Sequence, residues 1–307
     1  MKHIFIINPT AGKQDSRQRI YDMAKELREK HELDVQCITK KQGHATEIAR
    51  KLCEEGGELR FYACGGDGTA NEVANGILGF DNAAMTMVPV GTGNDLLKNF
   101  GDDLEKFRDV ENLWDGPVFP MDVIEVNGRY ALTIACSGID ARVAADVHKY
   151  SESPLLDGKS SYIVSLLVNF LFKGIGSHWK VEMDGEEMEG DWSLVSVCNG
   201  RYYGGGFMPV AEARMDDGVL NTLVVQKVTR RAFIRFVGPY SKGEYYKFPH
   251  LAQCYTPKVV RITSEKPDIV TCLDGETFQG SEVTIRLADK ELNFFGPAGC
   301  SCNATAR

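Results

Sequence analysis

A glycine-rich turn between a buried strand and a short helix constrains this chain more than any other feature. Residues 59–64 read as a buried strand, and residues 70–78 carry apolar side chains at helical spacing. Between them stands Gly65-Gly66-Asp67-Gly68-Thr69. The N–H groups of such a turn can close around a phosphate, and the N-terminus of the next helix adds partial positive charge. The carboxylate of Asp67 would repel a phosphate unless a divalent cation or a hydrogen-bonding network intervenes, so the turn predicts a metal-bound polyphosphate.

The first third of the chain alternates predicted strands with predicted helices. We expect strands at 3–7, 34–39, 59–64 and 84–90, and helices over 20–27, 45–53 and 70–79. This order predicts a three-layer, doubly wound α/β domain with a mainly parallel sheet. Ligands of such sheets lie at the carboxyl ends of the strands, where the loops here are 8–13, 39–44, 65–69 and 91–95.

Beyond about residue 116 the pattern changes to short strands separated by Asn-Gly and Asp-Gly turns. The expected strands are 118–126, 130–136, 181–184, 192–198, 219–226, 258–263, 270–273 and 283–287. They predict an all-β domain of two packed sheets, with a helix near 160–173. With 307 residues the chain suits two domains. We expect an α/β domain over 1–122, a β-sandwich over 123–288, and a segment 289–307 that packs back on the first domain.

Charge and composition exclude several classes of protein. The net charge of −8, without a strongly basic run, argues against binding to nucleic acid and against electrostatic anchoring on anionic lipid. The longest apolar stretch, 162–172, is about half a membrane span, so it is either a core helix, which we favour, or an interfacial one. Nine cysteines without a secretory signal predict reduced thiols in the cytoplasm.

Two further motifs of the first domain have both a structural and a chemical interpretation. Residues 8–13 (Asn-Pro-Thr-Ala-Gly-Lys) suit a surface turn, but Gly12 and Lys13 also suit phosphate contact after the first strand. Residues 91–95 (Gly-Thr-Gly-Asn-Asp) suit a helix entry capped by Asn94 or Asp95, or a second phosphate-facing loop. Leu96 replaces the third glycine of a dinucleotide fingerprint, which argues against a Rossmann NAD site.

The second domain contains two Asp-Gly-Glu triplets, 184–186 and 274–276, whose roles have to be distinguished. Hairpin turns explain both, and spacing does not choose between them, although the second follows a more buried strand end. The turn 216–218 (Asp-Asp-Gly) has the same explanation, with a metal site as the alternative. The glycine-rich run 199–207 is interpreted as a loop that faces the cleft between the domains.

Taken in order, these motifs resemble the soluble diacylglycerol kinase family of lipid kinases. The resemblance extends over nearly the whole chain and is carried by residues 8–13, 65–73, 91–95, 199–206, 216–218 and 273–276. It is strongest to the two-domain bacterial members. NAD kinases and, more distantly, phosphofructokinases share the shorter Gly-Gly-Asp-Gly-Thr signature, but Asn71-Glu72-Val73 and the late Asp-Gly-Glu favour the lipid-kinase branch.

The resemblance implies ATP- and Mg²⁺-dependent phosphorylation of diacylglycerol or a related lipid at a membrane surface, giving phosphatidic acid and ADP. The implied nucleotide site comprises Asn8, Pro9, Thr10, Ala11, Gly12, Lys13, Thr39, Gly65, Gly66, Asp67, Gly68, Thr69, Asn71, Glu72, Thr92 and Asn94. An acidic network around Mg²⁺ would comprise Asp67, Asp95 and Asp122, and a structural Mg²⁺ would be held by Asp217 with carbonyls near Arg214 and Val219. Glu276 would be the general base and Asp274 its acidic companion.

Three alternatives stay open: a sphingoid base as acceptor, NAD as acceptor, or a nucleotide sensor without turnover. The intact acids at 67, 95, 274 and 276 weigh against a sensor, because a sensor needs no base. We expect a cytoplasmic protein in peripheral contact with the membrane, through Tyr162–Phe172 or Trp179, with no transmembrane span. A homodimer is one option for its oligomeric state.

Overall fold

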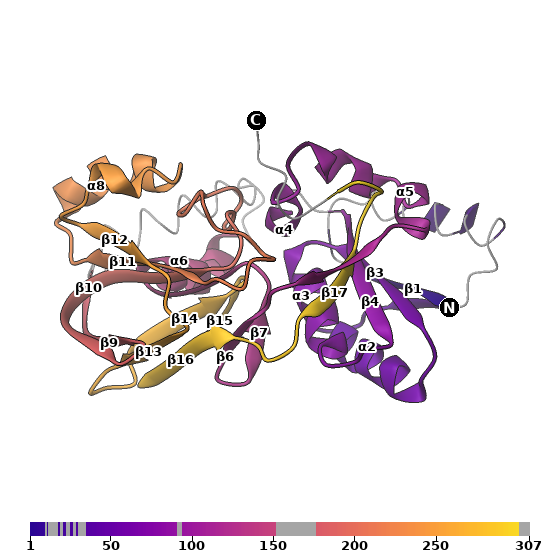
Figure 1. Cartoon of the computed structure of the whole chain (residues 1–307), viewed down its shortest axis with the longest axis horizontal. Coiled ribbons are helices and arrows are strands. Elements are labelled where there is room, and N and C mark those ends of the chain that lie inside the picture. Colours follow the sequence, from indigo (N-terminus) through magenta and orange to yellow (C-terminus); the bar gives the residue numbers. More distant parts are fainter. Residues whose placement is uncertain are drawn as a thin grey trace. The chain divides into compact units, whose positions relative to one another are not determined.

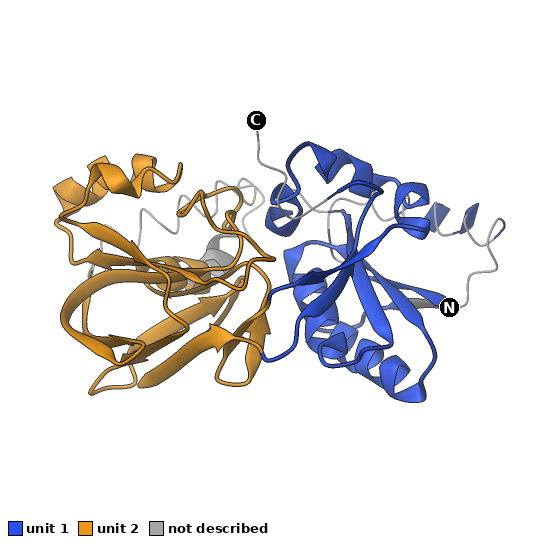
Figure 2. Ribbon diagram, viewed as in Figure 1, with its two compact units in different colours: residues 1–122, 289–307 blue, residues 123–288 orange. Residues whose placement is uncertain are grey.

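The computed structural model describes residues 1–9, 35–90, 94–151 and 176–300, with isolated positions between 11 and 29. The chain folds into two compact units, one of residues 1–122 with 289–307 and one of residues 123–288 (Figure 2). The expected helix 160–173 and half of the expected helix 20–27 lie outside the described residues. So do four of the implied site residues, namely Thr10, Gly12, Lys13 and Thr92.

The first unit is built on a six-stranded sheet with the order β2-β1-β3-β4-β17-β5. Its strands are β1 (Lys2–Ile7), β2 (Val35–Ile38), β3 (Leu59–Gly65), β4 (Ala83–Pro89), β5 (Val118–Met121) and β17 (Leu292–Phe295). The first four are parallel, and β17 runs parallel to β4 and antiparallel to β5. The prediction of a mainly parallel α/β sheet is confirmed. Figure 1 shows β17, in yellow, among strands from the start of the chain.

Continuous apolar runs explain why these strands form the centre of the unit. Ile4–Ile7 and Phe61–Cys64 are fully buried, as strands of a parallel sheet covered on its faces must be. The helices α2 (His44–Glu55) and α3 (Asp67–Ile77) pack together at Gly76, where a Cβ would lie 2.7 Å from Cβ of Ala49. The unit also contains α4 (Asp95–Lys98), η1 (Gly101–Arg108) and α5 (Glu111–Trp114).

The second unit is an antiparallel, β-sandwich-like sheet, so the predicted class of this part is also confirmed. Its strand order is β15-β14-β8-β10-β9-β13-β16-β6-β7, with β11 paired to β10 and β12 to β11. The strands are β6 (Ile124–Val126), β7 (Arg129–Ala131), β8 (Ile134–Gly138), β9 (Ser177–Met183), β10 (Glu186–Cys198), β11 (Asn221–Gln226), β12 (Ala252–Tyr255), β13 (Val259–Thr263), β14 (Ile269–Leu273), β15 (Glu276–Gly280) and β16 (Glu282–Leu287).

One long strand allows this single hydrogen-bonded network to enclose a core. The first half of β10 pairs with β9 and its second half with β8 and β11, with an irregular register between Trp192 and Leu194. Apolar side chains from both halves of the network meet in one buried cluster that includes Trp179, Trp192 and Val260. Since only 1% of Trp179 is exposed, the expectation that this side chain contacts a membrane is wrong.

Several boundaries differ from the expected ones. The expected strand 118–126 breaks at Asp122, so that β5 joins the first sheet and β6 the second. The expected strand 130–136 likewise divides into β7 and β8. Two helices, α6 (Ile139–Ser151) and α8 (Arg230–Tyr240), were not expected and contribute to a second apolar cluster against β8, β10 and β11.

Two further expectations concern membranes and thiols. Over the described ranges, no helix has the length and apolar character that crossing a bilayer requires. Free thiols are found at Cys53, Cys64, Cys136, Cys198, Cys254, Cys272 and Cys300.

Candidate active site

The strand ends that lead into the expected phosphate-facing loops lie together at the carboxyl edge of the first sheet. The backbone N–H of Asn8, after β1, donates to the carbonyl of Cys64 at 3.1 Å, and that of Val90, after β4, donates to Gly65 at 3.0 Å. Thr39, which is buried after β2, donates its N–H to Ile7 at 2.9 Å. The ends of four adjacent strands thus lie side by side, which is where open α/β sheets bind ligands.

The glycines of the turn between β3 and α3 serve different purposes. A Cβ on Gly65 would lie 2.2 Å from Oγ1 of Thr69, so packing requires a glycine there. Cβ atoms on Gly66 or Gly68 would meet no atom of the described residues within 4 Å, and neither glycine has a positive φ. The fold itself therefore does not require these two glycines. What they provide is uncovered backbone at the N-terminus of α3, where Gly66 is the N-cap and no side chain caps the helix.

The carboxylate of Asp67 joins this turn to the next loop. Its Oδ2 accepts the backbone N–H of Asp95 and its Oδ1 accepts that of Leu96, each at 3.0 Å. These are the first two residues of α4, and the preceding Asn94 is in the left-handed region with φ 47°. The loops after β3 and β4 are thereby fixed to each other by a charge-assisted pair of hydrogen bonds.

Asp95 is itself buried and lies beside a cation. Its carboxylate contacts Nζ of Lys98 at 2.5 Å, and its backbone carbonyl accepts Nδ2 of Asn99 at 3.1 Å. Of the three acids expected around Mg²⁺, Asp67 and Asp95 are therefore adjacent in this unit. The third, Asp122, is buried directly after β5.

Three other expected nucleotide-site residues support the same edge of the sheet. Nδ2 of Asn8 donates to Oγ1 of Thr69 at 3.2 Å. The carboxylate of Glu72 accepts the N–H of Ala45 at 3.1 Å, at the start of α2, where the N-cap residue has no capping side chain. Asn71 is buried and accepts Nδ2 of Asn75 at 2.9 Å. These contacts give Asn8, Asn71 and Glu72 structural partners within the unit.

Both Asp-Gly-Glu triplets form two-residue hairpin turns, as the turn interpretation predicts. The first joins β9 to β10 and the second joins β14 to β15. In each, the aspartate has a positive φ, 50° at Asp184 and 46° at Asp274, and is followed by a glycine with positive φ. In each, the following glutamate is exposed at the start of the next strand.

What the two aspartates hold differs. Asp184 accepts the N–H groups of Lys258 and Val259 near the start of β13. Asp274 accepts those of Leu132, Thr133 and Ile134, at 2.5, 3.1 and 3.0 Å, and also the hydroxyl of Thr133 at 2.5 Å. Asp274 thus anchors the turn that carries Glu276 to the segment that leads into β8.

The expected second metal site is a surface loop. Asp217 is exposed, and its Oδ1 accepts the N–H of Val219 at 3.0 Å. Arg214 contacts Asp216 at 3.9 Å. Within the described part of the chain, no group of three or more His, Cys, Asp or Glu side chains is arranged to hold a metal ion.

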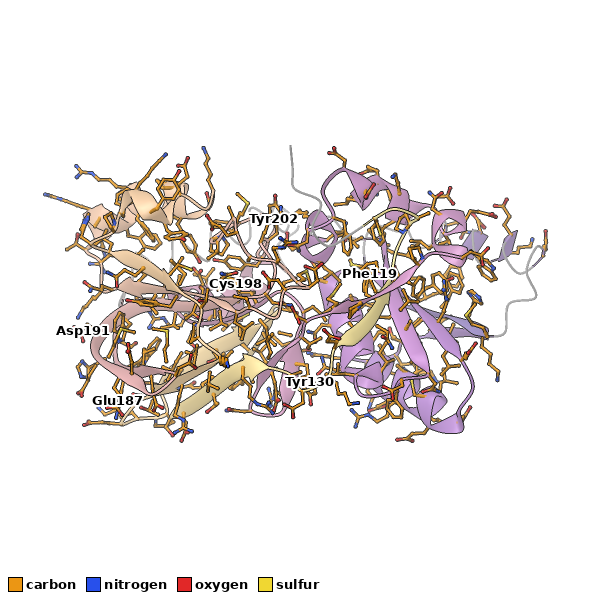
Figure 3. The ribbon with its side chains drawn as sticks, in the orientation of Figure 1. Phe119, Tyr130, Glu187, Asp191, Cys198 and Tyr202 are labelled. Carbon is orange, nitrogen blue, oxygen red and sulfur yellow. The ribbon has the colours of Figure 1, made fainter. Side chains whose placement is uncertain are left out.

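Sequence reasoning missed a buried polar cluster in the second unit. Oδ2 of Asp140, on α6, accepts the hydroxyls of Tyr203 and Tyr240, and these two hydroxyls lie 2.9 Å apart. Burial raises the pKa of the Asp140 carboxyl, and the two tyrosine hydrogen bonds oppose that shift. The sequence feature that could have indicated this cluster is the glycine-rich run after Cys198. That run contains Tyr203 next to Tyr202, which is labelled in Figure 3.

The cluster lies beside a small cavity between the sheet and α8. Asp140 and Tyr240 line it together with apolar side chains such as Phe207, Phe233 and Phe236. Its volume of about 20 Å³ has room for one water molecule.

Comparison with known proteins agrees with this arrangement. Residues 2–126 match the family described as diacylglycerol kinase catalytic domain, and residues 133–296 match the YegS C-terminal NAD kinase beta sandwich-like domain. Together the two matches define a two-domain kinase. The chain is 27% identical over 275 residues to a diacylglycerol kinase of Bacillus subtilis strain 168, with 88% of each chain covered. A solved diacylglycerol kinase structure from Bacillus anthracis has the same fold, with a TM-score of 0.70 at 20% identity over 98% of each chain.

The chain belongs to the diacylglycerol kinase family of lipid kinases, in the form that carries a YegS-type β-sandwich.

Proposed function

We propose that this protein transfers the γ-phosphoryl group of ATP to the hydroxyl of diacylglycerol or a closely related lipid at a membrane surface, giving phosphatidic acid and ADP. Its family of kinases supports the use of ATP. The observation that carries the nucleotide site is the uncovered backbone at Gly66 and Gly68. A side chain at either position would stand where a phosphate must approach the N-terminus of α3.

The residues of the first unit bind and orient the triphosphate. Backbone N–H groups at the start of α3 face the phosphates, and Asn8, Thr39 and Thr69 border them at the same sheet edge. Asp67 keeps the loops after β3 and β4 in register, so the site is preorganised before the nucleotide arrives. Four further members of the proposed nucleotide site lie outside the described residues: Thr10, Gly12, Lys13 and Thr92.

The carboxylates in this unit fit a role beside Mg²⁺. Asp67 is half-buried at the N-terminus of α3, and Asp95 and Asp122 complete the proposed acidic network. Mg²⁺ in kinases is commonly held by one or two carboxylates together with phosphates and waters, so a three-residue cage is not required. When bound, the ion would supply charge neutralisation for the transferred phosphoryl group. We propose a second, structural Mg²⁺ at Asp217 with the carbonyls near Arg214 and Val219.

Glu276 is the proposed general base, which removes the proton of the lipid hydroxyl. Its side chain is exposed on a hairpin turn whose position Asp274 fixes. General-base catalysis of this kind contributes roughly 10²–10⁴-fold to the rate. In this proposal Asp274 is a positioning residue, because its carboxylate is occupied by donors of the 132–134 segment.

The experiment is a radiolabelled phosphate-transfer assay with ATP and a panel of acceptors in mixed micelles: diacylglycerol, a sphingoid base, and NAD. Label in phosphatidic acid supports the proposal, and label only in NADP or in a phosphorylated sphingoid base would replace the acceptor. Glu276→Gln tests the base, and Glu186→Gln is its matched control because it occupies the same place in the other Asp-Gly-Glu turn. Normal turnover of Glu276→Gln would refute the base assignment.

A further inference from the structure

The outer face of α8 combines positive charge with an exposed apolar side chain. Arg230, Arg231, Ile234 and Arg235 are exposed on this helix, whereas Phe236 and Tyr240 are buried against the apolar cluster beneath it. Ile234 is 65% exposed, which makes it the most exposed large apolar side chain that the structure describes. Figure 1 shows α8 at the outer edge of the second unit, over β11 and β12.

The neighbouring segment η2 (Tyr245–Lys247) extends this face. Phe236 of α8 and Phe248, next to η2, pack edge to face with ring centroids 5.5 Å apart. Tyr246 is 61% exposed, so the segment that packs against α8 also exposes an apolar side chain. The outer face of α8 and η2 comprises five exposed residues, namely Arg231, Ile234, Arg235, Lys242 and Tyr246.

The charge of this segment is opposite to that of the chain. Residues 227–247 contain six basic residues and one acid, in a protein with a net charge of −8. Lys227 pairs with Asp191, and Lys247 pairs with Glu244. Arg231 and Arg235 form no ion pair with any described residue. Both side chains are exposed, so no residue in the described part of the unit neutralises their charge.

We propose that the outer face of α8 and η2 docks on the surface of an anionic phospholipid bilayer. Arginines flanking a protruding isoleucine and a tyrosine match the pattern of helices that lie in the membrane interface. The exposed Ile234 favours a bilayer over nucleic acid, because the interfacial region of a bilayer can bury an apolar side chain and a phosphate backbone cannot. The inference rests on the proposed function, because a lipid kinase must reach a substrate held in a bilayer. The net charge of −8 opposes electrostatic anchoring of the chain as a whole, but segment 227–247 is locally positive.

The test is co-sedimentation of the full-length chain with vesicles, without nucleotide. We expect binding to vesicles of phosphatidylglycerol and phosphatidylcholine, little binding to pure phosphatidylcholine, and loss of binding at high salt. Each arginine near such a surface raises the membrane partition coefficient about fivefold. The double variant Arg231→Gln with Arg235→Gln should therefore lower the partition coefficient about 25-fold. Ile234→Ser should also weaken binding.

Matched controls lie elsewhere on the same unit. Lys258→Gln with Lys266→Gln removes the same charge from exposed positions, and Val259→Ser trims another exposed apolar residue. All variants should melt within a few degrees of the wild type. The proposal is overturned if the wild type ignores anionic vesicles, if it binds neutral ones equally, or if the double arginine variant binds as the wild type does.

A kinase assay separates this inference from the proposed function. With a short-chain diacylglycerol dissolved below its aggregation limit, the docking variants should turn over at the wild-type rate. With diacylglycerol in anionic vesicles they should lose activity in parallel with binding. Anionic-vesicle binding that depends on the two arginines, in a protein that phosphorylates no lipid, would support docking and refute the proposed function.

Discussion

The carboxylate of Asp67 accepts the backbone N–H of Leu96 at 3.0 Å, and it accepts the adjacent N–H of Asp95 at the same distance. The acid at the centre of the glycine-rich turn therefore has a structural partner 29 residues later in the chain. The sequence left two explanations for an acid at this place, a divalent cation or a hydrogen-bonding network, and favoured a metal-bound polyphosphate. The hydrogen bonds show that it also fixes the geometry of the loop before α4.

We predict that Asp67→Asn loosens this connection. The amide of asparagine can accept only one of the two N–H groups and presents its own donor to the other. Loss of a hydrogen bond to a charged group costs about 1.5–3 kcal/mol. Urea unfolding of Asp67→Asn should show that loss, and Asp81→Asn, at an exposed position, should not. An unchanged free energy of unfolding would mean that the bridge to α4 adds nothing to stability.

The three glycines of the turn should respond differently to alanine. Gly65→Ala places a methyl group 2.2 Å from Oγ1 of Thr69 and should destabilise the unit by about 1–3 kcal/mol. Gly66→Ala and Gly68→Ala have space and should melt at or slightly above the wild-type temperature. Both should nevertheless bind ATP much more weakly, because the methyl groups stand where phosphate approaches. Calorimetric melting of the three variants measures the effect on packing, and ATP titration measures the effect on binding. Wild-type ATP affinity in both Gly66→Ala and Gly68→Ala would contradict the proposed site.

The sequence predicts most of the first sheet because its strands are continuous apolar runs. Ile4–Ile7 and Phe61–Cys64 are buried on both faces of the sheet, and each consists entirely of apolar residues. The topology of the second unit is harder to predict from the sequence, because β10 pairs with three strands and its two halves have different partners. The helix α6 was missed because it follows β8 at once, through Gly138 with a φ of 114°.

In the candidate site, too, the sequence predicts the loops but not the contacts of their side chains. The motifs indicate which loops carry polar side chains, and the parallel order brings these loops to one edge of the sheet. What each side chain contacts depends on residues far away in the sequence. Asp274 meets the 132–134 segment, and Asp140 meets Tyr240 across 100 positions, so neither contact can be derived from local spacing.

Asp274→Asn should destabilise the second unit more than Asp184→Asn. The asparagine at 274 would leave some donors of Leu132, Thr133 and Ile134 without a charged acceptor, at a cost of about 3 kcal/mol. Asp184 holds two N–H groups at an exposed turn, so its loss should cost less. In a Trp114→Phe background the remaining tryptophans, Trp179 and Trp192, lie in the second unit and report its unfolding by fluorescence. Equal destabilisation by the two changes would contradict an anchoring role for Asp274.

The buried Asp140 should make the stability of the second unit depend on pH. Burial raises the pKa of its carboxyl above the ordinary value of 3.8, so the native state holds this proton more tightly than the unfolded chain does. Its contribution to stability is therefore greatest below pH 3.8 and is lost as pH rises through the raised native pKa.

Asp140→Asn removes this titration while keeping an acceptor for Tyr203 and Tyr240. The stability of the variant relative to the wild type should therefore increase as pH rises from 4 toward neutrality. The free energy of unfolding of both proteins, measured by urea titration at several pH values in the same Trp114→Phe background, gives this difference directly. Tyr203→Phe is the companion variant, because it removes a hydrogen bond that stabilises the ionised carboxylate and should steepen the fall with pH. A difference that is constant across this range would mean that Asp140 titrates in the folded protein as it does in the unfolded chain.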